Sequence, residues 1–302
     1  MNQPQFENTI EILQTLPDAL GSIMVDNDHQ PFTNSQASLE QKEIDYPDLI
    51  TTGYRQGYWG IEFAADHMSL LKRALTEPLM TFSPWTLARI ILESSSTGYW
   101  LLDTSIDGHE RVSRSFSLRL QELREQATFG RDAIAQEINT SSHFQDASLV
   151  IDKRIEHLKD RATSLGIRHK LDRRNRLIGF GDGMPGATDL ARSAFNDSLD
   201  YRLLSGLTHG RFWANISLAL RKVDGRSKLE QDMTLTRALY IVTSVIHWFS
   251  KTTWEYFKLF GWNLKQAVAI LERLYDQAKF TTETRFWRKD YLDIVRPVHE
   301  PS

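Results

Sequence analysis

The segment Ala-Leu-Tyr-Ile-Val-Thr-Ser-Val-Ile-His-Trp-Phe, residues 238–249, is the most apolar stretch of this 302-residue chain. It is shorter than the ~20 residues that a membrane-spanning helix needs. Charged residues follow it at once, at Lys251, Glu255 and Lys258. The sequence therefore predicts a buried helix over residues 231–259, and no membrane partner is expected.

Helical spacing of apolar residues recurs on both sides of this segment. Residues 48–75 carry an apolar stripe of this kind, and Ser83-Pro84 is typical of a helix start, with serine as the N-cap. Alternating apolar residues bounded by hairpin turns are not found. The predicted fold class is therefore all-α, a multi-helix bundle. Further helices are predicted at residues 5–16, 83–102, 107–127, 131–138, 144–165, 187–195, 198–209, 211–222 and 263–279.

The length of the chain suits one large domain or two small ones. Residues 1–45 are predicted to be a helix followed by a polar connection over 22–45, residues 46–280 a single helical bundle, and residues 281–302 a tail. The glycine-rich stretch 179–186 (GFGDGMPG) is where an internal break would fall. It lacks Gly-Lys-Ser/Thr, and no strand is predicted before it, so it is not a phosphate-binding loop. We interpret it as a flexible connection, with gating of a site as the alternative.

The composition narrows the function classes. With 41% apolar and 25% charged residues the chain is ordinary for a globular protein, and its net charge of −3 produces no overall attraction to nucleic acid. The absence of cysteine excludes disulfides and thiol chemistry. The N-terminus lacks the features of a signal peptide, so a cytoplasmic protein is predicted. The histidine motifs of zinc proteases and di-iron helices are also missing, so we expect no metal site and no cofactor.

The residues best suited to chemistry lie at 201–210, Tyr-Arg-Leu-Leu-Ser-Gly-Leu-Thr-His-Gly. Arg202, Ser205 and His209 have the i, i+3, i+7 spacing of one helix face, and Gly206 would let a ligand or another helix approach the backbone closely. An arginine can hold a phosphate, and a histidine can move a proton near neutral pH. This pair suits attack of a ribose 2′-hydroxyl on its own phosphate without a metal. The alternative is an ordinary helix end, with His209 in the last turn and glycine after it.

A second pair, Arg89 and Glu93, lies one turn apart in the predicted helix 83–102. It is either a simple ion pair, worth on the order of a few tenths of a kcal/mol, or a buried carboxylate that orients Arg202 or His209. The small residues 94–98 (Ser-Ser-Ser-Thr-Gly) would allow another helix to pack closely. They indicate a central position for this helix.

Two further segments have a structural and a functional interpretation. Residues 154–176 contain more Lys and Arg than Asp and Glu, and form either a solvated face or a patch that binds nucleic acid. Aromatic residues in 248–262 are interpreted as packing, in the core or at a subunit contact. The candidates for phosphate contacts in the basic segment are Arg168, Lys170, Arg173, Arg174 and Arg176.

Residues 201–210, Tyr-Arg-x-Leu-Ser-x-x-x-His-Gly, resemble the signature helix of HEPN-like helical proteins, including uncharacterised bacterial families that share the Leu-Ser-x-x-x-His core. Residues 84–93 (PWTLARIILE), 100–103 (WLLD) and 111–114 (RVSR) resemble the N-terminal part of such families. Pro-x-x-Thr-x-Leu at 185–190 precedes the signature helix, as in those families. The similarity consists of scattered motifs between residues 50 and 250.

The resemblance implies an HEPN-like helical core with additional N- and C-terminal helices, a homodimer, and a metal-independent endoribonuclease that acts in stress or phage defence. Carried over to this chain, Arg202 would bind the phosphate of RNA and His209 would be the general acid/base. Ser205 and Tyr201 would be auxiliary, with Glu93 as the orienting carboxylate.

The chain departs from the pattern of active members at Leu203, where those members have a polar residue. This departure favours an alternative function, that of a non-catalytic helical binding or scaffold protein. In that alternative Arg202 and His209 hold the bundle together, and the aromatic C-terminal helices contact a partner.

Overall fold

The computed structural model describes residues 3–44, 47–76, 78–135, 142–214, 220–223, 226–229 and 233–277. Over these residues the protein is a nearly all-α, multi-helix structure, so the predicted fold class is confirmed. None of the described helices is both long and apolar enough to cross a membrane. The chain divides into two compact units, and one boundary between them falls after Pro185, inside the glycine-rich stretch. Unit 1 comprises Met1–Leu39, Gly57–Thr104 and Gly186–Ser302, and unit 2 comprises Glu40–Gln56 and Ser105–Pro185.

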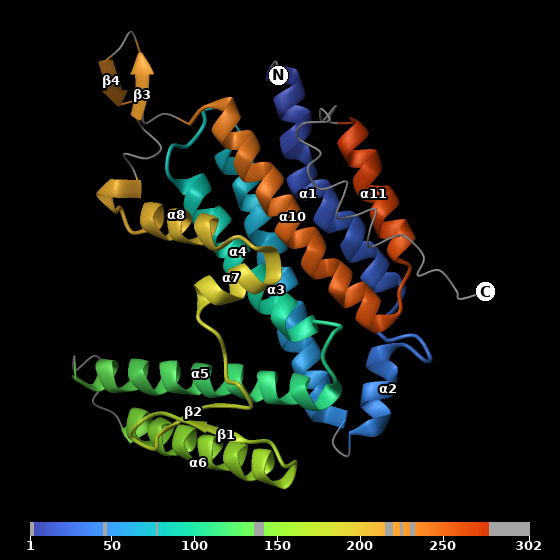
Figure 1. Ribbon diagram of the computed structural model, residues 1–302, viewed down its shortest axis with the longest axis vertical. Coiled ribbons are helices and arrows are strands. Elements are labelled where there is room, and N and C mark those ends of the chain that lie inside the picture. The colour runs from blue at the N-terminus through green and yellow to red at the C-terminus, as the bar shows by residue number, and fades with distance from the viewer. Residues whose placement is uncertain are drawn as a thin grey trace. The chain divides into compact units, whose positions relative to one another are not determined.

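Unit 1 is built around α10 (Leu235–Phe260), which contains the apolar segment 238–249 and is buried along most of its length. It packs on α4 and α1, and α11 lies beside α1 and α10 (Figure 1). Thr234 caps its start by accepting a hydrogen bond from the Arg237 backbone N–H, and Gly261, at a φ of 74°, ends it. The aromatic residues of 248–262 pack in this core, as predicted. The other elements of unit 1 are α1 (Gln3–Asp26), α4 (Ser83–Leu102), α7 (Ala187–Phe195), α8 (Ser198–Thr208), β3 (Leu220–Val223), β4 (Arg226–Leu229) and α11 (Leu264–Gln277).

Helix α3 (Pro47–Ala74) contributes to both units, and in unit 1 it approaches α4 very closely. A Cβ atom added to Gly60 would lie 2.6 Å from the carbonyl oxygen of Ser94. From the other side of α4, the Thr252 hydroxyl donates a 2.9 Å hydrogen bond to the Ser95 carbonyl oxygen. The small residues 94–98 therefore lie at the centre of unit 1, where the sequence indicated.

Unit 2 contains α5 (Gly108–Ala135), α6 (Ser142–Ser164), and the antiparallel hairpin of β1 (His169–Leu171) and β2 (Leu177–Phe180). Figure 1 shows α5 and α6 side by side, and the hairpin contacts both of them. Phe180 is buried and meets Phe116 of α5 edge to face, at 5.7 Å between ring centroids. The core of unit 2 therefore lies between α5 and the hairpin.

A buried ion pair joins α2 (Gln36–Glu43), α3 and α5 within unit 2. The Arg111 guanidinium donates to both carboxylate oxygens of Glu40, at 2.9 Å and 3.1 Å, and its side chain is completely buried. The Tyr54 hydroxyl donates to the same carboxylate at 2.8 Å, and its pKa is raised by burial and by the charge of Glu40. Bidentate geometry offsets the desolvation of the two charges. Arg111 belongs to the segment 111–114 that resembles HEPN-like families, and in this chain its guanidinium takes part in a buried ion pair with Glu40.

Several predicted helix boundaries are wrong. Helix α1 continues to Asp26 instead of ending at residue 16, because the apolar face resumes beyond Pro17 with the buried Leu20 and Met24. Residues 22–45 were predicted to be a loose connection, but they contain the end of α1 and all of α2. The helices predicted at 107–127 and 131–138 form one helix, α5, up to Ala135, whereas residues 136–138 and the predicted tail 281–302 lie outside the described residues. Phe82, rather than Ser83, occupies the N-cap position of α4.

The few short strands of the structure were not located by the sequence pattern. Residues 220–223 form β3, although 211–222 was predicted as a helix, and residues 215–219 lie outside the described part. Strand β2 runs directly into the glycine-rich stretch, where no strand was predicted. These strands have 3 or 4 residues, too few for an alternating pattern to be detected. Because β2 belongs to an antiparallel hairpin, the stretch still differs from a phosphate-binding loop.

Candidate functional site

The candidate site lies where α8 packs against α4 in unit 1. Helix α8 ends at Thr208, the His209 N–H donates to the Ser205 carbonyl oxygen at 3.1 Å, and Gly210 adopts a φ of 62°. Only a residue without a Cβ takes this conformation readily, so the His-Gly sequence does form a glycine-terminated helix end. This ending directs the His209 side chain to α4, where it meets Arg89.

Four side chains form the Arg89–His209 cluster: Arg89 and Glu93 of α4, Tyr201 of α8, and His209. The Arg89 Nη1 lies 3.0 Å from the His209 Nε2, and its Nε and Nη2 both lie 3.0 Å from the Glu93 Oε1. The guanidinium also lies 5.9 Å from the centroid of the Tyr201 ring. Because arginine nitrogens only donate, the His209 Nε2 accepts this hydrogen bond and the ring proton is on Nδ1. The contact therefore places a cation directly beside the imidazole ring.

The cluster is open to solvent at the histidine and partly covered at the arginine. His209 is exposed, whereas the Arg89 side chain keeps 17% of its surface and Glu93 keeps 35%. Burial raises the pKa of the Tyr201 hydroxyl, and the Glu93 charge raises it further, while Arg89 acts in the opposite direction. The Tyr201 hydroxyl therefore keeps its proton near neutral pH. The arrangement offers a base, a proton donor and an anion-binding cation in one place.

The structure brings together three of the predicted site residues, Tyr201, His209 and Glu93, but in a different arrangement from the one that spacing suggested. Arg202 is exposed and Ser205 half-buried, and no hydrogen bond or ion pair joins either side chain to another within the described ranges. Arg89, expected only as the ion-pair partner of Glu93, supplies the guanidinium next to His209. The pairing of α4 with α8 is a tertiary contact that spacing within one helix does not reveal.

The candidate nucleic-acid residues lie on the β1–β2 hairpin of unit 2 and its flank, and all of them are exposed. In the turn, Asp172 accepts hydrogen bonds from the Arg174 and Arg176 backbone N–H groups and from the Arg176 side chain. These hydrogen bonds lower the pKa of Asp172, and the bond from the Arg176 backbone N–H has the largest effect. The side chains of Arg173 and Arg174 make no hydrogen bond or ion pair within the part of the chain described, so their charges face solvent. The five exposed residues are Arg168, Lys170, Arg173, Arg174 and Arg176.

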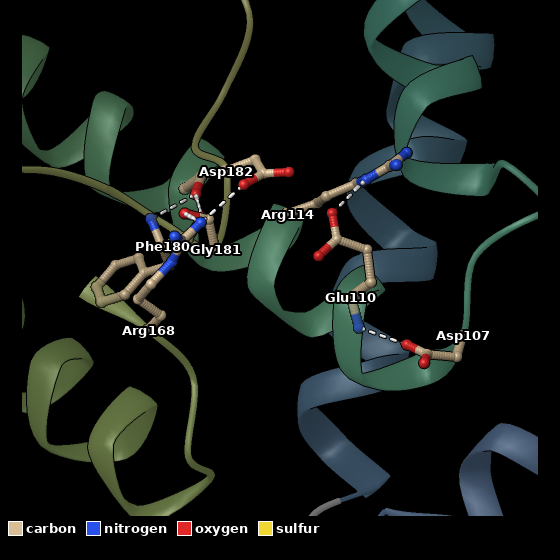
Figure 2. Close-up of polar contacts among 8 residues, drawn as sticks. Asp107, Glu110, Arg114, Arg168, Phe180, Gly181 and Asp182 are labelled. Carbon is tan, nitrogen blue, oxygen red and sulfur yellow. Dashed lines mark hydrogen bonds and ion pairs between the residues drawn. The ribbon is translucent and has the colours of Figure 1, made fainter. Parts of the chain in front are cut away.

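The other end of the hairpin is fixed by the glycine-rich stretch (Figure 2). Arg168 donates to the Gly181 carbonyl oxygen at 3.2 Å and to the Asp182 carboxylate at 2.8 Å. Gly181, at a φ of 55°, packs directly on α5, where an added Cβ would lie 2.4 Å from the Ser113 hydroxyl. The first part of the glycine-rich stretch is thus closely packed on α5, and Lys170 reaches the Asp182 carbonyl oxygen.

Sequence reasoning missed one cation near the turn. Arg124 of α5 is half-buried, and its pKa is lowered first by burial and then by the positive charge of Arg176. The Asp172 carboxylate, which pairs with Arg176 at 2.7 Å, acts in the opposite direction on this pKa, so an anion already lies near the two guanidinium groups. The position of Arg124 beside the turn could not be predicted from the sequence, because the hairpin comes to lie next to α5 only when the chain folds.

Comparison of the chain with family models, with curated proteins and with solved structures finds no significant match.

Proposed function

We propose that the protein is a cytoplasmic, metal-independent endoribonuclease that acts at the Arg89–His209 cluster, and that it works as a homodimer in stress or phage defence. The observation that carries the proposal is the 3.0 Å contact between the Arg89 Nη1 and the His209 Nε2 at the surface of unit 1. An imidazole beside a guanidinium combines a proton acceptor with a phosphate ligand. The location, the homodimer and the defence role rest on the composition and on the resemblance to HEPN-like proteins.

The reaction is attack of a ribose 2′-hydroxyl on the adjacent phosphorus. Arg89 binds a non-bridging phosphate oxygen with an Nη hydrogen, which releases the His209 Nε2 to take the proton of the 2′-hydroxyl. As the new O2′–P bond forms, the P–O5′ bond breaks, and Tyr201 gives its proton to the leaving oxygen. The products are a 2′,3′-cyclic phosphate and a free 5′-hydroxyl. Glu93 holds Arg89 in position through two hydrogen bonds.

The basic hairpin supports RNA as the substrate. The chain as a whole carries a net charge of −3, so attraction to a polyanion has to come from local groups. The cations of Arg173 and Arg174, which make no ion pair within the described residues, provide such a group in unit 2. We propose that they contact the phosphate backbone without reading its sequence.

The alternative, a non-catalytic binding or scaffold protein, is favoured by the contacts of Arg89 with Glu93. The carboxylate takes two of the guanidinium N–H groups and balances its charge. In this case the cluster joins α4 to α8 and has no chemical role. The two functions differ in what removal of His209 does.

The test is cleavage of mixed RNA in EDTA by wild type, His209→Gln, Arg89→Lys and Arg202→Ala. We expect wild type to produce 2′,3′-cyclic phosphate ends. Loss of the general base should reduce the rate by about 10²–10⁴-fold in His209→Gln, and Arg89→Lys should also be slow because lysine cannot hold both Glu93 and a phosphate.

Arg202→Ala is the matched control, an exposed arginine on the same helix, and it should cut like wild type. If no protein cuts while His209→Gln lowers the melting temperature by several degrees, the scaffold function is correct. If Arg202→Ala is inactive while Arg89→Lys still cuts, the arginine that binds the phosphate is Arg202 and not Arg89.

A further inference from the structure

Two exposed aromatic side chains directly follow the Arg89–His209 cluster in the chain. Phe212 is 78% exposed and Trp213 is 54% exposed, although aromatic rings of this size are mostly buried elsewhere in unit 1. They lie three and four residues after His209. Exposed apolar rings beside a polar, charged cluster are typical of a binding surface.

Trp213 is held against α8 by one edge. Its Cζ2 atom would lie 2.7 Å from a Cβ atom added to Gly206. The indole ring can therefore pack directly against the backbone of α8 because Gly206 has no side chain. The backbone secures this arrangement, because the Arg211 N–H donates to the Gly206 carbonyl oxygen at 2.8 Å. Gly206 is one turn before His209, and residues three apart on a helix have Cβ positions about 5–6 Å apart. The ring is thus held one helical turn from His209, while about half of its surface faces solvent.

From these contacts we infer that Phe212 and Trp213 are a stacking platform for unpaired bases, so that the substrate is single-stranded rather than duplex RNA. This inference rests on the proposed function and specifies its substrate. A base can stack on an aromatic side chain only when it is not already stacked and paired in a duplex. An indole that is already fixed against Gly206 loses little freedom when a base stacks on it.

The charge of the neighbouring segment favours a nucleic acid over an apolar protein partner. Arg211 directly precedes the two aromatic residues, and the sequence from 211 to 229 contains five Lys and Arg residues against one acidic residue, Asp224. Basic residues interleaved with aromatic ones are the pattern of sequence-tolerant single-strand binding.

The experiment measures the Kd of a labelled RNA oligonucleotide by fluorescence anisotropy. All its riboses carry a 2′-O-methyl group, which removes the attacking hydroxyl, so that binding is read without cleavage. The same oligonucleotide is also tested as a duplex with its complement. We expect wild type to bind the single strand more tightly than the duplex, and Trp213→Ala to weaken single-strand binding by about 5- to 150-fold, the range for loss of one stacked base.

Trp213→Phe should restore most of the affinity, and Phe212→Ala, which removes a mostly exposed ring, reports on the platform without disturbing the fold. The matched control is Trp59→Ala on α3, because Trp59 is 57% exposed, close to the value for Trp213. Its single-strand affinity should equal that of wild type.

Three results would overturn the inference: a wild type that binds no single strand or prefers the duplex, aromatic variants that bind like wild type, or a Trp213→Ala variant that alters only self-association in sedimentation. The proposed function is read separately, by cleavage of unmodified RNA. A platform that binds RNA in a protein that never cuts it would refute the ribonuclease and leave the platform intact. Cleavage that is unaffected in the aromatic variants would support the ribonuclease and refute the stacking platform.

Discussion

Among single residues, His247 of α10 is a buried titratable group that makes unit 1 sensitive to acid. It is 8% exposed, and its ring lies 5.9 Å from that of Phe195. Burial, and then the nearby charge of Lys251, lower its pKa from 6.5 to about 3. In the unfolded chain the same imidazole takes up a proton near pH 6.5. Since the unfolded state then binds more protons than the native state, the free energy of unfolding must fall as the pH drops below 6.5.

We therefore predict that His247→Phe makes the protein less sensitive to acid. One pH unit corresponds to about 1.4 kcal/mol per proton, so wild type should lose about 2 kcal/mol between pH 7 and pH 5 through this residue alone. Urea unfolding at both pH values measures the difference. Replacement of the exposed His157 by glutamine is the control and should leave the loss unchanged. An equal loss in His247→Phe and wild type would show that another group is responsible.

The candidate site shows how far residue spacing could lead. The i, i+7 relation between Arg202 and His209 singled out α8, and in the structure His209 and Glu93 both contact Arg89. The partner of the histidine was Arg89, which lies on another helix 120 residues earlier in the sequence. Spacing within a helix follows from local geometry, whereas the choice between two arginines depends on how α4 and α8 pack.

Among elements, the crossing of α3 and α4 depends on glycine. An added Cβ at Gly60 would meet the Ser94 backbone at 2.6 Å, whereas one at Gly21 in α1 would meet nothing within 4 Å. We predict that Gly60→Ala destabilises the protein by about 1–3 kcal/mol, because the two helices must separate. Gly21→Ala should stabilise it by about 0.4–1 kcal/mol, because alanine restricts the unfolded chain. Urea unfolding compares the two, and an increase in stability for both would mean that the crossing can relax.

The elements themselves were predictable where the apolar period was long. The 3.6-residue pattern located α3, α4, α7, α8, α10 and α11 to within a few residues. It failed at Pro17, because a proline inside α1 is tolerated where buried residues on both sides hold the helix. It also failed at the short hairpins, where Asn175, at a φ of 56°, and the Asp172 hydrogen bonds specify a turn that apolar periodicity does not report.

In the whole molecule, the uneven distribution of charge predicts how RNA binding responds to salt. Each phosphate neutralised by a cation contributes about 0.7 to the slope of log K against log salt for a single strand. Arg173→Ala with Arg174→Ala should therefore weaken binding and reduce that slope by as much as about 1.4. Titrations at several KCl concentrations measure it.

The control for this charge effect is a double replacement of Arg192 and Lys265 by alanine, which changes the net charge equally at two exposed positions of unit 1. It should leave the slope close to that of wild type. An equal reduction in both double variants would indicate that overall charge, and not the hairpin, governs the binding.

The division of the chain has a consequence for its synthesis. Unit 2 ends at Pro185, so all of its residues have been made before any of α7, α8, α10 or α11 exists. It can fold while the remainder is still on the ribosome. Helices α1 and α4 emerge early but must wait, with their apolar faces uncovered, until α10 is translated. The nascent chain therefore passes through a period in which all of unit 2 has been synthesised while α1 and α4 still lack α10, the helix on which both of them pack.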